Sequence, residues 1–131
     1  MTPAPLQYSN DWNMVAVMSS RLTPPAFWIL TALAAGRRHG YEILRETALS
    51  SGGDVTLRVA TLYAALERLE REGAIASDGE EIVNGRARRY YRLTEDGAQR
   101  LADEARAMER AARAARASLG AQRFAFAAGM A

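Results

Sequence analysis

The chain has 131 residues, of which 49% are hydrophobic and 24% charged, values typical of a single soluble domain. It has no cysteine and one histidine, His39, which excludes disulfides, cysteine-ligated zinc and most metal sites and catalytic triads. All 17 basic residues are arginine and the formal net charge is +2, so the case for a nucleic-acid partner depends on where the arginines cluster.

The sequence contains no membrane-spanning or secretory pattern. No apolar run approaches the roughly 18 residues of a membrane-spanning helix. The N-terminus lacks a basic segment followed by an apolar one. We therefore expect a cytoplasmic protein that has no membrane partner.

The first half of the chain predicts an arm and two helices. Prolines and polar residues over 1–20 predict a flexible arm. Thr23 followed by Pro24 predicts a capped helix start, and the largely apolar segment that follows is closed by Gly36. A second helix follows His39 and ends at the Ser-Ser-Gly-Gly segment 50–53.

The stretch Leu57–Gly73 predicts the third helix. Val59, Leu62, Leu66 and Leu69 recur at steps of three and four, which predicts a buried stripe. The opposite side carries small residues, a hydroxyl and arginines: Ala60, Thr61, Ala64, Arg68 and Arg71. Taken alone this is an ordinary surface helix, although small residues also permit close approach to a flat polar partner.

Asn84-Gly85 between two strand-like runs predicts a β-hairpin, because both central residues of a type I′ turn need positive φ. Four of the seven residues from Arg86 to Arg92 are arginine. We expect these charges to repel one another without an anionic partner, although a solvated hairpin is the alternative. Alternation places Arg89, Tyr91 and Leu93 on one face.

Thr94 predicts the cap of a last helix over 95–120, followed by a tail over 121–131. Apolar residues follow a heptad repeat: Ala98, Leu101, Ala105, Met108, Ala112, Ala115 and Leu119. A 3.5-residue repeat favours pairing with a second copy. The alternative is that this helix folds back on its own domain.

Three helices followed by a basic hairpin form the order of a winged helix-turn-helix, and here the chain resembles the PadR family of transcriptional regulators. The matching segments lie between Leu22 and Gly97: Leu22-Thr23, Ile29-Leu30, 39–44, 61–66, Leu69-Glu70, Gly73, 88–94 and Gly97. The resemblance implies a mainly α (α+β) fold: a winged helix domain over 21–94, with a two-stranded wing, and a C-terminal dimerisation helix as in the compact subfamily. In two places the chain departs from the family pattern, with Arg58 at the usual serine or threonine and Val59-Ala60 at the usual Pro-Gly.

The predicted DNA contacts fall into three sets. Thr61, Ala64 and Arg68 would read the major groove, while Arg86, Arg88 and Arg89 on the wing would bind phosphates or a minor groove. Tyr41 and Tyr63 resemble family positions that touch the DNA backbone, with core packing as the alternative for both, and Arg58 can reach a phosphate. We assign Tyr91 to the core and His39 to a turn or cap.

The resulting hypothesis is a sequence-specific homodimeric repressor that binds a pseudo-palindromic operator in double-stranded DNA and is released by a small-molecule effector. The alternative is a winged-helix module that binds protein and not DNA. We predict no enzyme activity, cofactor or metal site. Family effectors are commonly aromatic acids or hydrophobic drugs, and we place such a molecule near Phe27, Trp28 and Met108, with core packing of these residues as the alternative.

Overall fold

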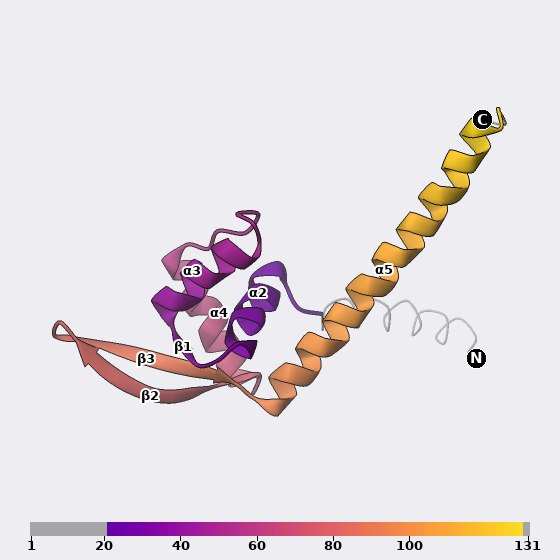
Figure 1. Ribbon diagram of the computed structural model, residues 1–131. Helices are drawn as coiled ribbons and strands as arrows, with labels where there is room; N and C mark the ends of the chain where they lie inside the picture. Colours follow the sequence, from indigo (N-terminus) through magenta and orange to yellow (C-terminus); the bar gives the residue numbers. More distant parts are fainter. Residues whose placement is uncertain (1–20, 130–131) are drawn as a thin grey trace, which may run out of the picture. The chain divides into compact units, whose positions relative to one another are not determined.

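The structure is a computed structural model that describes residues 21–129. The predicted arm over 1–20 lies outside the described residues. The elements are α2 (Pro24–Ala34), β1 (Arg38–His39), α3 (Gly40–Ser50), α4 (Val59–Arg71), β2 (Ile75–Val83), β3 (Arg86–Leu93) and α5 (Glu95–Ala127). Helices α2, α3 and α4 gather beside the base of the β2–β3 hairpin (Figure 1). The predicted mixed α and β winged helix fold is confirmed.

The sheet has one strand more than we predicted. Its antiparallel order is β1-β3-β2, and the two residues of β1 pair with Tyr91 and Tyr90 of β3. The hairpin itself is as predicted, because Asn84 has φ 53° and Gly85 has φ 76°. A strand of two residues is too short to show an alternating pattern in the sequence. β1 can therefore be identified only from its pairing with β3 in the structure.

Side-chain caps define the starts of α2 and α3. The Thr23 hydroxyl accepts a hydrogen bond from the Ala26 amide at 3.2 Å. His39 Nδ1 accepts from the Glu42 amide at 3.4 Å, and the Glu42 carboxylate accepts from the His39 amide at 3.1 Å. These contacts form a capping box, which confirms His39 as a cap and places it at the start of α3.

The core lies between the three helices and the sheet. Its largest fully buried side chains are Ile29, Leu30, Ile43, Leu62, Leu66, Leu69 and Ile75, and Tyr91 is buried beside them as predicted. Val59 was predicted to belong to this stripe, and that prediction is wrong. It is 59% exposed, because it is the first residue of α4 and lies at the end of the helix, away from the buried leucines.

Helix α5 continues past the predicted end at 120 and reaches Ala127. A glycine inside a helix costs only about 1 kcal/mol relative to alanine. The residues around Gly120 are strong helix formers, which offset that cost. The left-handed glycine that follows the helix is Gly129, with φ 70°.

Two compact units divide the chain, and the first extends to Leu101. The opening turns of α5 therefore belong to the winged helix domain. Gly97 is buried there, and a Cβ on it would lie 2.0 Å from the Ala74 carbonyl oxygen. The Thr94 hydroxyl donates to the Gly73 carbonyl at 2.6 Å and accepts from the Gly97 amide at 3.0 Å. The ends of α4, β3 and the start of α5 thus meet at one joint.

Candidate nucleic-acid interface

The outer side of α4 is a surface of small and polar residues. Leu62, Leu66 and Leu69 hold the helix in the core, and the residues on the opposite side, including Thr61 and Ala64, are exposed. Arg58 occupies the N-cap position, and its side chain makes no capping hydrogen bond. Because no side chain caps α4, the backbone N–H groups of its first turn remain available for hydrogen bonds. Helix N-termini that bind phosphate have the same feature.

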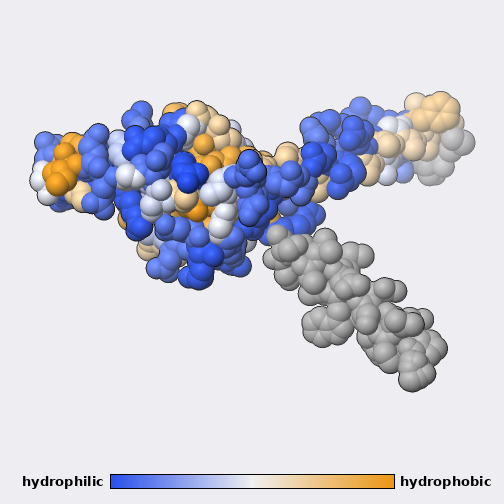
Figure 2. Space-filling view, turned by 90° about the horizontal axis from the view of Figure 1, so that it is seen from below, coloured by the Kyte–Doolittle hydropathy of each residue, from blue (hydrophilic) through white to orange (hydrophobic). Residues whose placement is uncertain are grey.

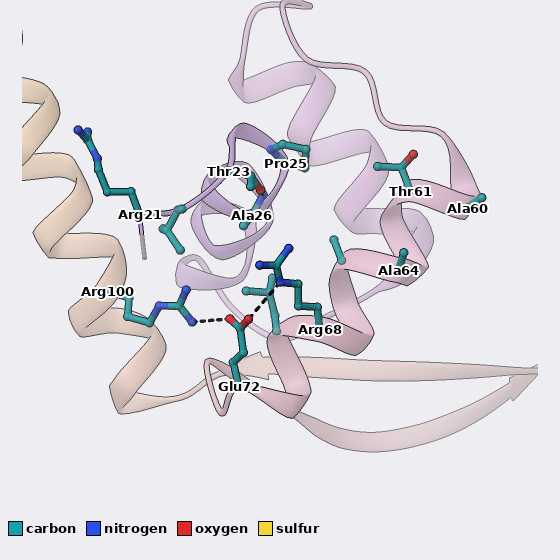
Figure 3. A pocket seen from close by; sticks show the side chains of 13 residues that line it. Arg21, Thr23, Pro25, Ala26, Ala60, Thr61, Ala64, Arg68, Glu72 and Arg100 are labelled. Atoms are coloured by element: carbon teal, nitrogen blue, oxygen red, sulfur yellow. Dashed lines mark hydrogen bonds and ion pairs between the residues drawn. The ribbon is translucent and has the colours of Figure 1, made fainter. Parts of the chain in front are cut away.

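A groove of about 810 Å³ runs along one flank of α4. The three predicted base-reading residues, Thr61, Ala64 and Arg68, all line it (Figure 3). Its other wall is the start of α2, including Thr23 and Pro25. These three residues therefore share one surface, as predicted, but that surface is hollowed and partly apolar.

Arg68 is engaged within the chain. Its Nε donates to Glu72 at 3.1 Å, and Arg100 Nη1 donates to the other Glu72 oxygen at 3.0 Å (Figure 3). The hydrogen bond from Arg100 holds the pKa of Glu72 below its usual value, with a smaller contribution from Arg68, although burial acts in the opposite direction. This hydrogen bond uses only the Nε of Arg68, and the pair is exposed, so it restrains the Arg68 side chain weakly.

The two predicted backbone-contacting tyrosines are both exposed near the start of α3. Tyr41 is the second residue of that helix. The Tyr63 ring lies across its first residue, since a Cβ on Gly40 would be 2.8 Å from the Tyr63 hydroxyl oxygen. Tyr63 is about 160° around the α4 axis from Thr61, so it occupies the opposite flank from the groove. Exposure of both rings favours surface contact over core packing.

The wing is less purely basic than its arginines suggest. In the strand register Glu80 lies opposite Arg89 and Glu81 opposite Arg88. Such cross-strand pairs of opposite charge are mutually stabilising. Contrary to the expectation from the sequence, mutual repulsion of the wing arginines therefore does not by itself require an anionic partner.

The three predicted wing arginines differ in their surroundings. Arg89 donates to the Ser77 hydroxyl at 3.0 Å and lies 3.6 Å from the Glu70 carboxylate of α4, so it ties the wing to that helix. Within residues 21–129, Arg86 and Arg88 form no salt bridge. Of these three arginines, Arg86 and Arg88 are therefore the better placed to bind an external anion.

A second arginine anchors the middle of the wing and was not predicted. Arg37 donates to the Asp78 carbonyl at 2.7 Å and pairs with the Asp78 carboxylate at 3.2 Å. Its guanidinium lies 3.9 Å from the centre of the Tyr90 ring. The register shifts between Ser77 and Glu80, where this side chain binds. Arg37 and Asp78 are brought together only by the folded sheet, so no local sequence pattern predicts their contact.

The tip of the wing carries an exposed apolar residue. Ile82 is 76% exposed and lies opposite Ala87, next to the Asn84-Gly85 turn. Figure 2 shows this hydrophobic patch at the end of the hairpin, surrounded by hydrophilic surface. The hairpin thus offers a small apolar end flanked by Arg86.

The residues predicted to hold an effector lie outside the groove. Phe27 and Trp28 pack edge to face, with ring centres 5.2 Å apart, and both are partly buried on α2. Met108 belongs to the second compact unit. None of the three lines the groove beside α4.

The predicted dimerisation residues of α5 divide at the boundary of the two units. Leu101 packs against the core of the winged helix domain. Further along the helix Met108 is 45% and Leu119 59% exposed, and Ala112 and Ala115 are exposed between them. From Met108 onward, this apolar seam has no cover within residues 21–129.

Neither metal binding nor membrane insertion finds support in the described part of the chain. Among residues 21–129 there is no group of three side chains able to hold a metal ion. None of the helices in that range is long and apolar enough to cross a bilayer.

The part of the chain that contains α3, α4 and the wing matches a known family. Residues 29–103, more than half of the chain, match the Transcriptional regulator PadR-like family. The chain belongs to this family. Its members are transcriptional regulators and not enzymes, and the resemblance seen in the sequence is confirmed.

A curated relative agrees with this assignment. Over 86 residues the chain is 38% identical to Transcriptional regulator Rv3488 of Mycobacterium tuberculosis, a match that covers 66% of this chain and 64% of that protein. The chain spans slightly less than two thirds of the length of the curated relatives it matches.

Two solved structures show the same fold. A PadR family regulator from Clostridium difficile is 24% identical with a TM-score of 0.63, over 74% of this chain and 99% of that one. Bacillus subtilis PadR, crystallised in complex with operator DNA, is 28% identical with a TM-score of 0.54 over 60% of this chain and 44% of that one.

Proposed function

We propose that this protein is a sequence-specific DNA-binding repressor that acts as a homodimer on a pseudo-palindromic operator. One observation carries the proposal: α4 exposes a face of small residues in the same domain as a wing whose Arg86 and Arg88 make no salt bridge within residues 21–129. The likeness to Bacillus subtilis PadR, which was crystallised with operator DNA, supports it.

In this proposal the outer face of α4 enters the major groove. Thr61 and Ala64 have short side chains, which permit close approach and contact with a thymine methyl. The terminal Nη groups of Arg68 bond a guanine, and Arg58, Tyr41 and Tyr63 contact the DNA backbone. Phosphate contacts fix the orientation of the protein, while the α4 side chains select the sequence.

The dimer part of the proposal assigns α5 as the interface. Met108 and Leu119 are exposed on the seam, and a second copy would cover them. The two recognition helices would then reach successive major grooves, roughly 34–36 Å apart along the DNA.

Effector release is the last part of the proposal. The groove beside α4 has the volume of a small-molecule site, and a molecule in it would touch Thr61 and Ala64. Phe27, Trp28 and Met108 remain the sequence-based alternative. Titration of aromatic acids and hydrophobic cations against a Trp12→Phe variant would report on Trp28 alone, because the chain has only two tryptophans. Competition with DNA by a compound that leaves Trp28 emission unchanged would favour the groove.

The main experiment measures DNA binding across salt for an Arg86→Ala, Arg88→Ala double variant. We expect weaker binding and a salt slope smaller by roughly one unit per lost phosphate contact. The matched control removes the same two charges from α5, with Arg110→Ala and Arg113→Ala. An unchanged slope in the wing variant would refute the wing contacts.

A protein-binding winged-helix module is the second candidate function. Glu80 and Glu81 favour it, because they lie opposite Arg89 and Arg88 and reduce the charge of the wing. Sequencing the DNA that the purified protein retains from genomic fragments separates the two. Enrichment of a palindromic motif supports the repressor, whereas no specific retention at low salt favours the module.

A further inference from the structure

The seam of α5 is longer than the sequence pattern suggested. Because the helix continues to Ala127, Phe126 falls one heptad after Leu119 and extends the same seam, and it is also exposed. Alanines occupy the middle of the seam, and bulkier residues lie on either side of them. A helix that keeps such a seam uncovered in water gains little stability from packing, so a partner is needed.

The charges beside the seam are strongly asymmetric along the helix. Glu109 is the last acidic residue of the chain, and four arginines follow it: Arg110, Arg113, Arg116 and Arg123. Glu109 and Arg116 are seven residues apart and occupy the same heptad position, directly beside the seam. Residues at this position meet the partner helix in a two-helix pair and select its direction.

A parallel pair of α5 helices places like charges together. In a parallel pair this heptad position faces a residue five positions earlier on the partner, so Glu109 of one copy would face Glu104 of the other. Arg116 and Arg123 would face Ala111 and Ser118, which offer no countercharge. The parallel arrangement therefore contains repulsion and no compensating attraction.

An antiparallel pair places opposite charges together. In that arrangement the position beside the seam faces its equivalent on the partner, and one alignment brings Glu109 against Arg116 twice, once at each end. The same alignment stacks Ala112 against Ala115 at the centre. Sliding the pair by one heptad in one direction brings Glu109 against Glu109. Sliding it in the other direction pairs Glu109 with Arg123, but it places Arg116 against Arg116 at the centre and Ala112 opposite the polar Gln122.

We propose that two copies of this chain pair their α5 helices antiparallel, centred between Ala112 and Ala115. Met108 of each copy packs against Leu119 of the other, and Glu109 of each copy pairs with Arg116 of the other. The short central alanines bring the two helices close. Phe126 reaches the level of Leu101 of the second copy, so bulky residues flank the alanines at both ends. This inference rests on the homodimer proposed above and specifies its direction and register.

Charge reversal tests the direction. Glu109→Arg and Arg116→Glu should each weaken dimerisation by at least about tenfold in sedimentation equilibrium, since each variant converts two attractions into repulsions. The double variant Glu109→Arg, Arg116→Glu should restore the wild-type dimer. In a parallel pair Glu109→Arg would instead strengthen the dimer, because it would face Glu104.

Arg113→Glu is the matched control. Arg113 follows Glu109 by four residues and supports the helix from outside the seam. Its reversal should therefore leave dimerisation unchanged. A loss of dimer equal to that of Arg116→Glu would mean that helix weakening, and not pairing, explains the reversals, and would overturn the register.

Cysteine cross-linking tests the register, and the chain suits it because it has no cysteine of its own. An equimolar mixture of Met108→Cys and Leu119→Cys proteins should form the mixed disulfide dimer under mild oxidation. Neither variant alone should cross-link efficiently, because antiparallel pairing separates the two Leu119 positions by about 16 Å along the helix. Efficient cross-linking of Leu119→Cys alone would overturn the antiparallel pair.

Different results would contradict the proposed homodimer and its proposed register. A wild-type chain that sediments as a monomer at all concentrations would overturn both the proposed homodimer and this inference. A stable dimer in which the reversals and cross-links follow the parallel pattern would overturn the register alone. DNA binding, measured separately, would stand in either case.

Discussion

Helices α4 and α5 use similar apolar repeats with different outcomes. In α4 the three leucines of the stripe are buried by α2, α3 and the sheet. In α5 only Gly97 is buried, and Met108 and Leu119 remain exposed. An apolar repeat therefore predicts a helix that needs cover, and it leaves open whether the cover belongs to the same chain.

The same Leu→Ala substitution in each helix should distinguish stability that comes from packing within the chain from stability that comes from a second copy. Leu66→Ala removes a fully buried side chain of α4 and should lower the free energy of unfolding by about 2–5 kcal/mol. Leu119→Ala should change the stability of the winged helix domain by less than about 0.5 kcal/mol.

Urea unfolding at two protein concentrations measures both effects. The loss in Leu66→Ala should not depend on concentration. Leu119→Ala should remove the concentration dependence that a dimer contributes to the wild-type curve. A large, concentration-independent loss in Leu119→Ala would mean that α5 folds back on its own domain.

Two glycines of α5 offer a second comparison. Gly97→Ala adds a methyl group where the Ala74 carbonyl oxygen lies, and should lower the free energy of unfolding by about 1–3 kcal/mol. Gly120→Ala meets no heavy atom within 4 Å and should stabilise the helix by up to about 1 kcal/mol. Thermal unfolding of both variants checks the opposite signs, and equal effects would contradict the division of the helix.

The smallest expected effect concerns alkaline pH. Burial raises the pKa of Tyr91, so the folded protein keeps this phenol neutral where the unfolded chain ionises it. Stability from this group is complete below the unfolded pKa of about 10 and is lost as pH rises toward the folded pKa. At 10 °C, the free energy of unfolding of Tyr91→Phe, measured with urea, should fall less steeply between pH 9 and pH 11 than that of the wild type. An unchanged slope would contradict a raised pKa of Tyr91 in the folded protein.

Much of the fold was predictable because its signals are local. Thr23, His39 and Asn84-Gly85 each determine a cap or turn through their nearest neighbours. The missed features depend on distant residues. Strand β1 exists because β3 lies beside it, and Arg37 reaches Asp78 across the sheet.

The sequence predicted which residues of the candidate site share a surface, but it did not predict the ion pairs that its arginines form. Thr61, Ala64 and Arg68 do share a surface, since helical spacing determines that. The partners that restrain Arg68 and Arg89 were not foreseen. Glu72 lies one turn after Arg68, so its spacing offered a signal. Glu70 approaches Arg89 only through the folded hairpin.

The close approach at Gly97 restricts which residue can begin the C-terminal helix. Its first turn is held against the end of α4 by the Thr94 hydroxyl and by contact with the Ala74 carbonyl. Any side chain at position 97 would have to displace the turn that joins α4 to β2, so the place where the chain passes from the wing into α5 admits glycine alone.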